Sequence, residues 1–367
     1  MKKSPVDKKL LISVLLLISS GFLIFLSASL GLLARDSANF GSIAFKQIFF
    51  GLLPGLVALY IFSKFDYMKW KKIAFWLFVF SVFLNLIIFI PGVGLTHGGA
   101  TRWLLIGSFS LQVSEVLKIA AIMYFAAWLS LVKEKVSTWQ GGLAPLAVML
   151  VITGVLCLIQ PDTDTFIVIS TSLTAMFLVA GGKWKHIAVL FLVGAIALTL
   201  LAYERPYIRA RIATFLDPSA ESLTSGYQIK QSLIAIGSGG ITGRGFGQSI
   251  QKFNYLPEPV GDSIFAVAAE EFGFLGSITL IGLFIFFTLR TLKVAEKASN
   301  QFGSLLAVGI VTYIIIQSFV NIAAMVGVLP LSGIPLLFVS QGGTALLFVL
   351  AEVGILLNIS RSAKLVQ

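Results

Sequence analysis

The run LLISVLLLISSGFLIFLSASLGLL, residues 10–33, contains no charged residue and decides the class of the fold. It is long enough for an α-helix to cross the hydrocarbon core of a bilayer, which takes about 20 residues. Lys2, Lys3, Lys8 and Lys9 precede it, as in a signal peptide. The run is too long for a signal peptide, however, and it lacks a clear small-residue cleavage site. We therefore expect a retained first membrane span.

The composition excludes an ordinary soluble domain. Hydrophobic residues make up 57% of the 367 residues, charged residues only 12%, and the mean hydropathy is +0.96. The apolar runs are continuous, which is typical of membrane helices and not of the alternating strands of a barrel. The net charge of +11 is placed at the ends of these runs and not on a basic face with interleaved aromatics, so nucleic-acid binding is not expected.

The sequence predicts an all-α polytopic membrane protein with about ten transmembrane helices. It forms a single membrane domain, residues 1–367, in which residues 203–262 are a long extracytoplasmic loop between spans 7 and 8. The expected spans are 10–33, 45–64, 72–90, 115–132, 143–159, 164–181, 186–203, 263–290, 303–326 and 337–359.

The distribution of Lys and Arg predicts the orientation. With a cytoplasmic N-terminus, most of the 27 basic residues fall on cytoplasmic segments, and the short outer loops hold few. This asymmetry favours an even number of spans with both termini in the cytoplasm. The long loop then faces outward.

Two short polar clusters are expected on that outer face. In the first, Arg102-Trp103 precedes a helix on which Glu115 and Lys118 are three residues apart and can pair. An ion pair beside an interfacial Trp and a site for a lipid headgroup or pyrophosphate explain this cluster equally well. The second is Gln160–Thr165, where we expect Asp162 or Asp164 to cap the following helix.

The long loop contains two segments with distinct patterns. Residues 226–237, which include Gln228, have apolar side chains at helical spacing and indicate an amphipathic or re-entrant helix. The glycine-rich segment 237–247 could direct backbone N–H groups toward an anion, but it fits no nucleotide-binding fingerprint. Its spacing favours a flexible loop.

The loop re-enters the membrane at Asp262, four residues after Glu258. Asp262 is a candidate functional acid or base, although capping the next helix would also explain it. Glu270 and Glu271 follow about two turns into the span, where carboxylates need partners or water. We therefore expect a polar cavity that opens outward. With two histidines in the chain, a His-based metal site or a Ser-His-Asp triad is not expected.

These clusters, in this order, resemble the SEDS family (shape, elongation, division and sporulation), which includes FtsW and RodA. The likeness covers nearly the whole chain, and the string QKFNYLPE at 251–258 is closer to the division branch, FtsW. The residues that carry the resemblance are Arg102-Trp103, Ser114-Glu115, Gln160–Asp162, Asp217-Pro218, Gly226–Gln228, 231–240, Tyr255–Glu258, Asp262, 264–273, Leu329-Pro330, Gly342-Gly343 and Asn358–Arg361.

The resemblance implies an inverting peptidoglycan glycosyltransferase that polymerises lipid II, as both donor and acceptor, outside the bacterial cytoplasmic membrane, at the division septum. One carboxylate then acts as base while cations hold the pyrophosphate leaving group. Asp262 matches the family's catalytic aspartate. A divalent cation, Mg²⁺ or Mn²⁺, is plausible, but no ligand set is evident. The implied partners are a class B penicillin-binding protein and other division proteins. The residues implied to bind substrate are Arg102, Trp103, Glu115, Lys118, Asp162, Gln228 and Glu258.

Several positions depart from the family pattern. Pro259–Gly261 replaces the usual Ala-His-Thr, and Ser332 stands where the family has a lysine. Glu352, deep in the last span, has no family counterpart, and we expect it to pair with Gln317 or Asn321. A division scaffold without catalysis therefore stays open as an alternative. So does a flippase for lipid-linked precursors, because a polar cavity within the spans would serve either activity.

Overall fold

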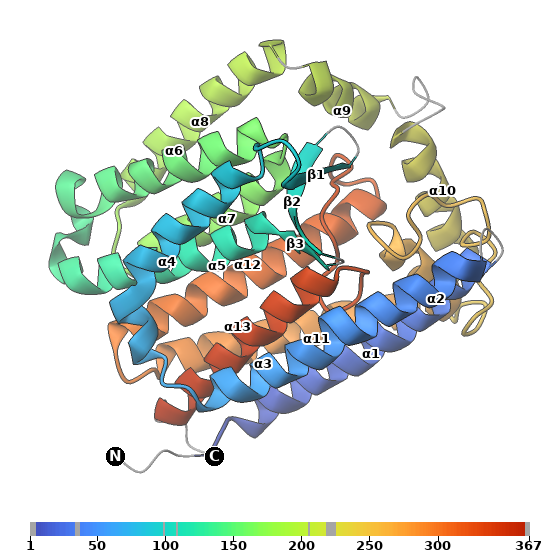
Figure 1. Cartoon of the computed structure of the whole chain (residues 1–367), viewed down its shortest axis with the longest axis horizontal. Helices are drawn as coiled ribbons and strands as arrows, with labels where there is room; N and C mark the ends of the chain where they lie inside the picture. Colours follow the sequence, from blue (N-terminus) through green and yellow to red (C-terminus); the bar gives the residue numbers. More distant parts are fainter. Residues whose placement is uncertain are drawn as a thin grey trace.

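The computed structural model describes residues 5–33, 37–97, 100–107, 109–204, 206–217 and 225–363, and these form a bundle of long helices (Figure 1). Asp7 and Ser360, near the two ends of the chain, are hydrogen-bonded at 3.1 Å at one end of the bundle. The bundle helices are α1 (Lys8–Leu33), α2 (Ser37–Lys46), α3 (Leu53–Lys64), α4 (Met68–Ile87), α5 (Val113–Val132), α6 (Ala144–Ile159), α7 (Thr163–Val179), α8 (Trp184–Glu204), α11 (Ile264–Glu296), α12 (Gln301–Met325) and α13 (Gly343–Ser362).

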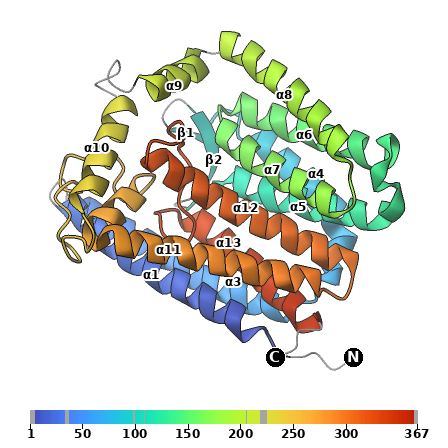
Figure 2. The ribbon, with the colours of Figure 1, turned by 180° about the vertical axis from the view of Figure 1, so that it is seen from behind.

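The opposite end of the bundle carries the smaller elements (Figures 1 and 2). Helix α8 runs along the rim and leads through α9 to α10, which lies beside the ends of α1 and α11 in both views. These elements are β1 (Gly94–His97), β2 (Ala100–Ile106), β3 (Phe109–Gln112), α9 (Pro206–Leu216) and α10 (Ser225–Ser238).

The expected class of fold is confirmed. In the described part of the chain, eight helical segments are long and apolar enough to cross a membrane, and 163–179 and 184–197 are shorter apolar helices at the expected sixth and seventh spans. The count of ten spans stays a prediction. The expected last span begins too early, because residues 337–342 form turns and the helix begins at Gly343.

Helices α5, α12 and α13 form the interior of the bundle, and α3 and α4 lie at its lipid-facing surface. Small residues let the inner helices approach their neighbours closely. At Gly354 of α13, an added Cβ would lie 2.6 Å from the backbone oxygen of Leu59 in α3. Any side chain there would separate the two helices.

A small antiparallel sheet, which an all-α fold does not include, covers residues 94–112. Its strand order is β1-β2-β3, and Trp103 of the central strand pairs with Gln112. Because neighbouring residues of a strand point to opposite faces, Arg102 and Trp103 are directed differently although they are adjacent. The pairing holds Trp103 beside Gln112, the N-cap residue of α5.

The expected helix at 226–237 is confirmed as α10, but the glycine-rich segment that follows is not a flexible loop. It packs against a break in α11 at Gly273, which has a φ of +64°. Arg244 N–H donates to the carbonyl of Glu270, and Phe274 N–H donates to the carbonyl of Gly240. A Cβ at Gly243 would lie 2.2 Å from the backbone oxygen of Glu271, so glycine is required for this close approach.

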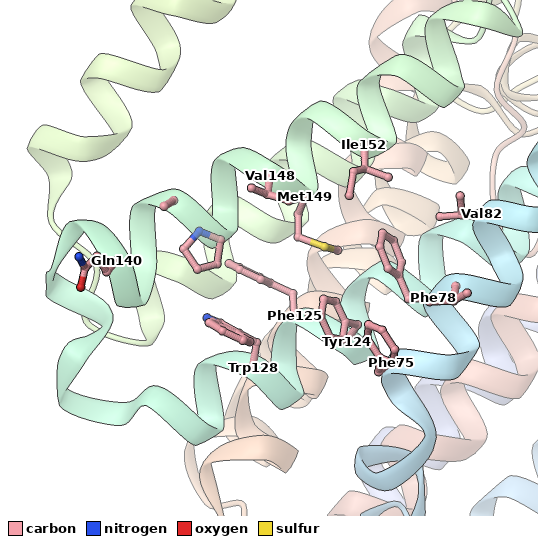
Figure 3. A pocket seen from close by; sticks show the side chains of 13 residues that line it. Phe75, Phe78, Val82, Tyr124, Phe125, Trp128, Gln140, Val148, Met149 and Ile152 are labelled. Carbon is pink, nitrogen blue, oxygen red and sulfur yellow. The ribbon is translucent and has the colours of Figure 1, made fainter.

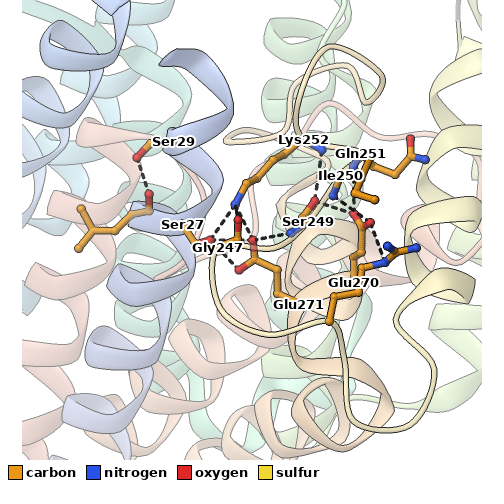
Figure 4. Close-up of polar contacts among 11 residues, drawn as sticks. Ser27, Ser29, Gly247, Ser249, Ile250, Gln251, Lys252, Glu270 and Glu271 are labelled. Carbon is orange, nitrogen blue, oxygen red and sulfur yellow. Dashed lines mark hydrogen bonds and ion pairs between the residues drawn. The ribbon is translucent and has the colours of Figure 1, made fainter. Parts of the chain in front are cut away.

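A buried ion pair at Lys252, in the loop that follows this segment, joins the loop to helices α1 and α11 (Figure 4). The Nζ atom of Lys252 lies 2.7 Å from Oε1 of Glu271 and also donates to Ser27 Oγ of α1 at 3.1 Å. Ser27 Oγ in turn donates to Glu271. Lys252 and Glu271 are 0% and 1% exposed, so this charge pair is fully removed from solvent.

The neighbouring Glu270 fixes the loop backbone. Its carboxylate accepts hydrogen bonds from the N–H groups of Ile250 and Gln251 and from Ser249 Oγ (Figure 4). Arg244 also forms an ion pair with Glu270, with 3.3 Å between its Nε atom and Oε1 of the carboxylate. The expectation that Glu270 and Glu271 face a polar cavity is therefore wrong, because both carboxylates are buried and anchor the loop to α11.

Removing one charge of the buried pair should destabilise the protein strongly. Lys252→Met leaves Glu271 buried without its cation, which lowers the free energy of unfolding by about 3–5 kcal/mol. Thermal unfolding of the purified protein in detergent measures this. Lys230→Met is the control, because Lys230 is exposed on α10 and a surface substitution of this kind should change stability by about 0.5 kcal/mol or less. A Lys252→Met/Glu271→Leu double variant should recover most of the loss; equal instability would contradict this account.

Candidate active site

Asp262 lies in the turn just before α11, and three consecutive carbonyl groups fix that turn. The carbonyl of Val260 accepts from Gln341 N–H at 2.7 Å, and that of Gly261 accepts from Ser340 Oγ at 2.8 Å. The carbonyl of Asp262 accepts from Asn321 Nδ2 at 2.9 Å. These bonds explain why residues 337–342 form turns, because their polar groups are directed to this loop instead of to a helix.

Glu258 and Gln228 support the same turn from the other side. The carbonyl of Glu258 accepts from the N–H groups of Gly261 and Ser263, which closes the turn locally. Gln228 of α10 donates to Ser263 Oγ at 2.9 Å. Ser263, and not Asp262, is the N-cap residue of α11. The Asp262 carboxylate therefore has no capping role.

The Asp262 carboxylate faces a cavity of about 570 Å³. The cavity lies between the sheet, the α2–α3 region, α9 and the start of α13. Residues that line it are Lys46, Gln47, Phe50, Ala100, Arg102, Trp103, Ser110, Gln112, Arg211, Glu258, Gly261, Asp262, Gly333, Pro335, Gln341, Gly342, Gly343, Thr344 and Ala345.

Three cations and two carboxylates share this cavity. Arg102 donates to the carbonyl groups of Gln160 and Pro161, which places its guanidinium at the cavity wall. Arg211 pairs with Asp164 at 3.0 Å. Together with Lys46, these side chains place three cations in the wall of the cavity that Asp262 and Glu258 also line.

Burial raises the pKa of Asp262 from its ordinary value to about 7. The negative charges of Glu258 and Asp164 raise the pKa further, and Arg211 and Arg102 oppose them. Within the described residues, no side chain hydrogen-bonds to this carboxylate. A carboxylate of this pKa accepts a proton readily near neutral pH, as a general base requires.

Asp162 lies behind the wall and does not line the cavity. It caps α7, accepting from Thr165 N–H at 3.4 Å and from Thr165 Oγ1 at 2.9 Å, which confirms the expected capping. Burial raises its pKa, and the nearby Arg102 opposes that shift. Its neighbour Asp164 instead accepts from Gly333 N–H at 3.3 Å and so connects Arg211 to the cavity rim.

Glu115 and Lys118 form the expected ion pair, at 2.8 Å, but they are fully buried beneath the cavity. Lys118 also donates to Gln317 Oε1 at 2.9 Å, and Gln317 Nε2 donates to the carbonyl of Pro335 in the cavity wall. Tyr313 donates to Glu115. Gln317 therefore connects the pair to the cavity wall.

Glu352 of α13 faces the same buried cluster, within electrostatic reach of Glu115 and Lys118. Neither of its carboxyl oxygens has a hydrogen-bond partner among the described residues. The expected pairing with Gln317 or Asn321 is wrong, because Gln317 bonds to Lys118 and Pro335, and Asn321 bonds to the loop at Asp262 and Ile334.

Sequence reasoning missed several cavity residues. Lys46 and Gln47 fall inside an apolar run, although two polar residues at the outer end of a span are a usable signal. Gln47 accepts from Gly342 N–H at 3.0 Å and donates to the carbonyl of Ser340, so it joins the cavity to the start of α13. The pairing of Arg211 with Asp164 left no sequence signal, because 47 residues separate them.

The fold and the cavity define a class: a polytopic helical membrane protein with a cavity at one end of its bundle that is lined by a buried carboxylate and three cations. The family model described as "Cell cycle protein", which unites FtsW, RodA and SpoVE, matches residues 8–365. The chain belongs to this family, the SEDS family that its motifs resemble.

Individual relatives agree with this assignment. Stage V sporulation protein E of Bacillus subtilis is 37% identical over 363 residues, which cover 99% of each chain. A probable peptidoglycan glycosyltransferase FtsW of Saccharophagus degradans is 40% identical over 348 residues, 93% of this chain and 89% of that protein. A chain from a peptidoglycan synthase complex that coordinates polymerization and crosslinking superposes with a TM-score of 0.82 at 25% identity, covering 98% of both chains.

Replacing Glu352 should not destabilise the protein. Glu352→Leu removes a buried carboxyl group without a hydrogen-bond partner, so the free energy of unfolding should stay the same or rise by about 1–3 kcal/mol. Glu115→Leu is the matched control: it leaves Lys118 buried without its anion and should destabilise by about 3–5 kcal/mol. Thermal unfolding in detergent compares the two. A Glu352→Leu variant as unstable as Glu115→Leu would contradict the assignment.

Proposed function

We propose that this protein is an inverting peptidoglycan glycosyltransferase that polymerises lipid II, with Asp262 as its general base. The observation that carries the proposal is the Asp262 carboxylate, with a pKa of about 7, facing a cavity with a wall of three cations. Relatives named as probable peptidoglycan glycosyltransferases over almost the whole chain support the same reaction.

The chemistry requires few protein groups. A hydroxyl of the acceptor saccharide attacks the anomeric carbon of the donor and gives its proton to Asp262. The bond from that carbon to the pyrophosphate oxygen breaks, and its electron pair leaves with undecaprenyl pyrophosphate. Pyrophosphate needs no protonation to leave, unlike the alkoxide that a glycoside hydrolase must protonate. One base and a set of cations therefore suffice.

The cavity residues divide between these two tasks. Lys46, Arg102 and Arg211 hold the pyrophosphate, because guanidinium and ammonium groups neutralise the charge that develops on it. Arg211 provides a cation near Gly333, next to the position where Ser332 replaces the family's lysine. Trp103 offers an aromatic face to a sugar ring.

The other residues expected to bind substrate have positioning roles in this proposal. Glu258 shapes the turn at Asp262 and raises its pKa, and Gln228 holds Ser263 beside it. Glu115, Lys118 and Asp162 support the cavity wall from behind. The Pro259–Gly261 departure is compatible with catalysis, because this segment contributes its carbonyl groups to the turn.

A divalent cation would have to share ligands with the substrate. Among the described residues, no group of three His, Cys, Asp or Glu side chains is arranged to hold a metal ion. Mg²⁺ in such sites binds one or two carboxylates together with phosphate oxygens. The cavity residues alone do not form a metal site, and no step of the proposed reaction depends on one.

The proposed reaction sets the orientation. The cavity would face outward from the cytoplasmic membrane, with both termini in the cytoplasm, residues 203–262 as an extracytoplasmic loop of one membrane domain, and the septum as the place of action. The distribution of Lys and Arg supports this orientation. A class B penicillin-binding protein is the proposed partner, alongside other division proteins, because the superposed chain comes from a complex that couples polymerization to crosslinking.

Glycan synthesis should depend on Asp262. Purified protein with its penicillin-binding partner and labelled lipid II should give glycan strands on a gel, and Asp262→Asn should reduce the rate by about a hundredfold or more. Asp66→Asn, an exposed aspartate at the other end of the bundle, is the matched control and should be fully active. Lipid II movement across vesicles that persists in Asp262→Asn, with no polymer from the wild type, would favour the flippase. Wild-type protein inactive in both assays would favour the scaffold.

The pH dependence should report the titration of Asp262. A base acts only when deprotonated, so kcat/KM should be constant above about pH 7 and fall about tenfold per unit below it. Glu258→Gln removes a negative charge that raises the pKa of Asp262, so the midpoint should move to lower pH. Initial rates between pH 5 and 9 measure both effects. A midpoint that is unchanged in Glu258→Gln, or that moves upward, would contradict the assignment.

A further inference from the structure

A second cavity, separate from that of Asp262, lies in the half of the bundle that contains the termini. Figure 3 shows it from close by. The cavity has a volume of about 670 Å³ and lies between α4, α5 and α6. Side chains from all three helices point into it, and nearly all of them are apolar. The lining residues are Phe75, Phe78, Val79, Val82, Tyr124, Phe125, Trp128, Gln140, Ala144, Pro145, Val148, Met149 and Ile152.

This cavity is a groove open to the lipid. Phe75 and Val79 on one wall are 49% and 42% exposed, and Val148 on the other is 56% exposed. Phe125 and Met149 form a buried floor. Flat lipid-facing surfaces make loose contacts with many lipid chains, whereas a groove with a floor and two walls surrounds a single chain and so gains more dispersion energy.

The length of the groove fits one leaflet. The wall from Ala144 to Ile152 of α6 extends about 12 Å along the helix axis, at about 1.5 Å per residue, and Gln140 lies in the turn just before it. One leaflet of hydrocarbon is about 15 Å thick. The groove therefore fits an acyl chain that enters from the membrane surface near the termini and ends near the bilayer centre.

The mouth of the groove is basic. Lys72 lies one turn before Phe75 on the same face of α4, and it is exposed. Lys133 and Lys135 are exposed in the 3₁₀ turn that follows α5, Lys133–Ser137. The backbone of Lys135 packs against Gly141, next to the groove residue Gln140. Glu134 lies between Lys133 and Lys135, so the three lysines and this one carboxylate leave a net positive charge where the headgroup of a lipid in the groove would lie.

We propose that this groove is a binding site for an anionic glycerophospholipid. One acyl chain occupies the groove, and the phosphate headgroup contacts Lys72, Lys133 and Lys135 at its mouth. The lipid belongs to the leaflet beside the termini, the cytoplasmic leaflet in the proposed orientation. It joins α4 to α6, which make few direct contacts with each other. The site shares no residue with the Asp262 cavity.

Native mass spectrometry of the full-length protein in detergent tests the acyl-chain site. Titration with phosphatidylglycerol should load one lipid per protein, and Val148→Trp, which fills the groove, should reduce its retention about tenfold. A tenfold change in retention corresponds to about 1.4 kcal/mol. Withdrawing two methylene groups of the acyl chain from apolar contact would cost slightly more than this, because each contributes about 0.8 kcal/mol. Val151→Trp is the matched control on α6, because Val151 is 64% exposed but outside the groove. It should bind as the wild type does.

Phosphatidylcholine with identical chains tests the headgroup. The wild type should retain phosphatidylglycerol about tenfold better, and Lys72→Gln/Lys133→Gln/Lys135→Gln should abolish this preference. The control variant is Lys64→Gln/Lys69→Gln/Lys71→Gln. It removes the same amount of charge at the same end of the bundle, from lysines that lie over aromatic rings. It should keep the preference.

Three outcomes would overturn the proposal. Retention that is equal in Val148→Trp and the wild type would show that the groove is not the site. Equal retention of the two phospholipids by the wild type would show that the site does not select an anionic headgroup. Displacement of phosphatidylglycerol by an equal concentration of a polyprenyl phosphate would assign the groove to an isoprenoid chain. If Val148→Trp does not fold, Val148→Phe on the same wall provides the same test.

Discussion

The ion pair between Lys252 and Glu271 is the interaction on which the end of the bundle that contains Asp262 depends. It joins α1, α11 and the loop that leads to Asp262, and it lies where no solvent screens it. Charges so deeply buried are tolerated only when each has its partner and further hydrogen bonds. Ser27, the carbonyl of Gly247 and the N–H of Ser249 supply those bonds. The loop is therefore fixed to both helices by buried polar contacts.

The loop fixed in this way gives Asp262 its environment. Ten residues after Lys252, the chain turns back into the bundle, and hydrogen bonds from Gln341, Ser340 and Asn321 hold the carbonyl groups of that turn. The Asp262 carboxylate is left without a hydrogen-bonding side chain among the described residues, beside Glu258 and in a largely buried position. Burial and a like charge both disfavour ionisation. The same packing that fixes the loop therefore raises the pKa of the proposed base.

The sequence predicts the local features of this structure well. Apolar runs identify the long membrane helices, and the spacing of Glu115 and Lys118 predicts their ion pair. Asp162 is recognisable as a helix cap. All three features can be predicted because each depends on residues that are close together in the sequence. The sheet at 94–112 was missed because its strands are short and do not alternate clearly. The early start expected for α13 has a related cause. Residues 337–339 are apolar and continue the apolar pattern of the helix, but hydrogen bonds from Ser340 and Gln341 to residues far away in sequence hold this segment in turns.

The most direct test is the titration of the Asp262 carboxyl group itself. Infrared difference spectra of the wild type and Asp262→Asn, recorded between pH 4 and 9, isolate the carbonyl band of the protonated side chain. A midpoint near pH 7 is predicted, because burial and Glu258 oppose ionisation of this carboxylate. A midpoint near pH 4, the value of an unperturbed aspartate, would contradict the assignment of Asp262 as a base adjusted by its surroundings.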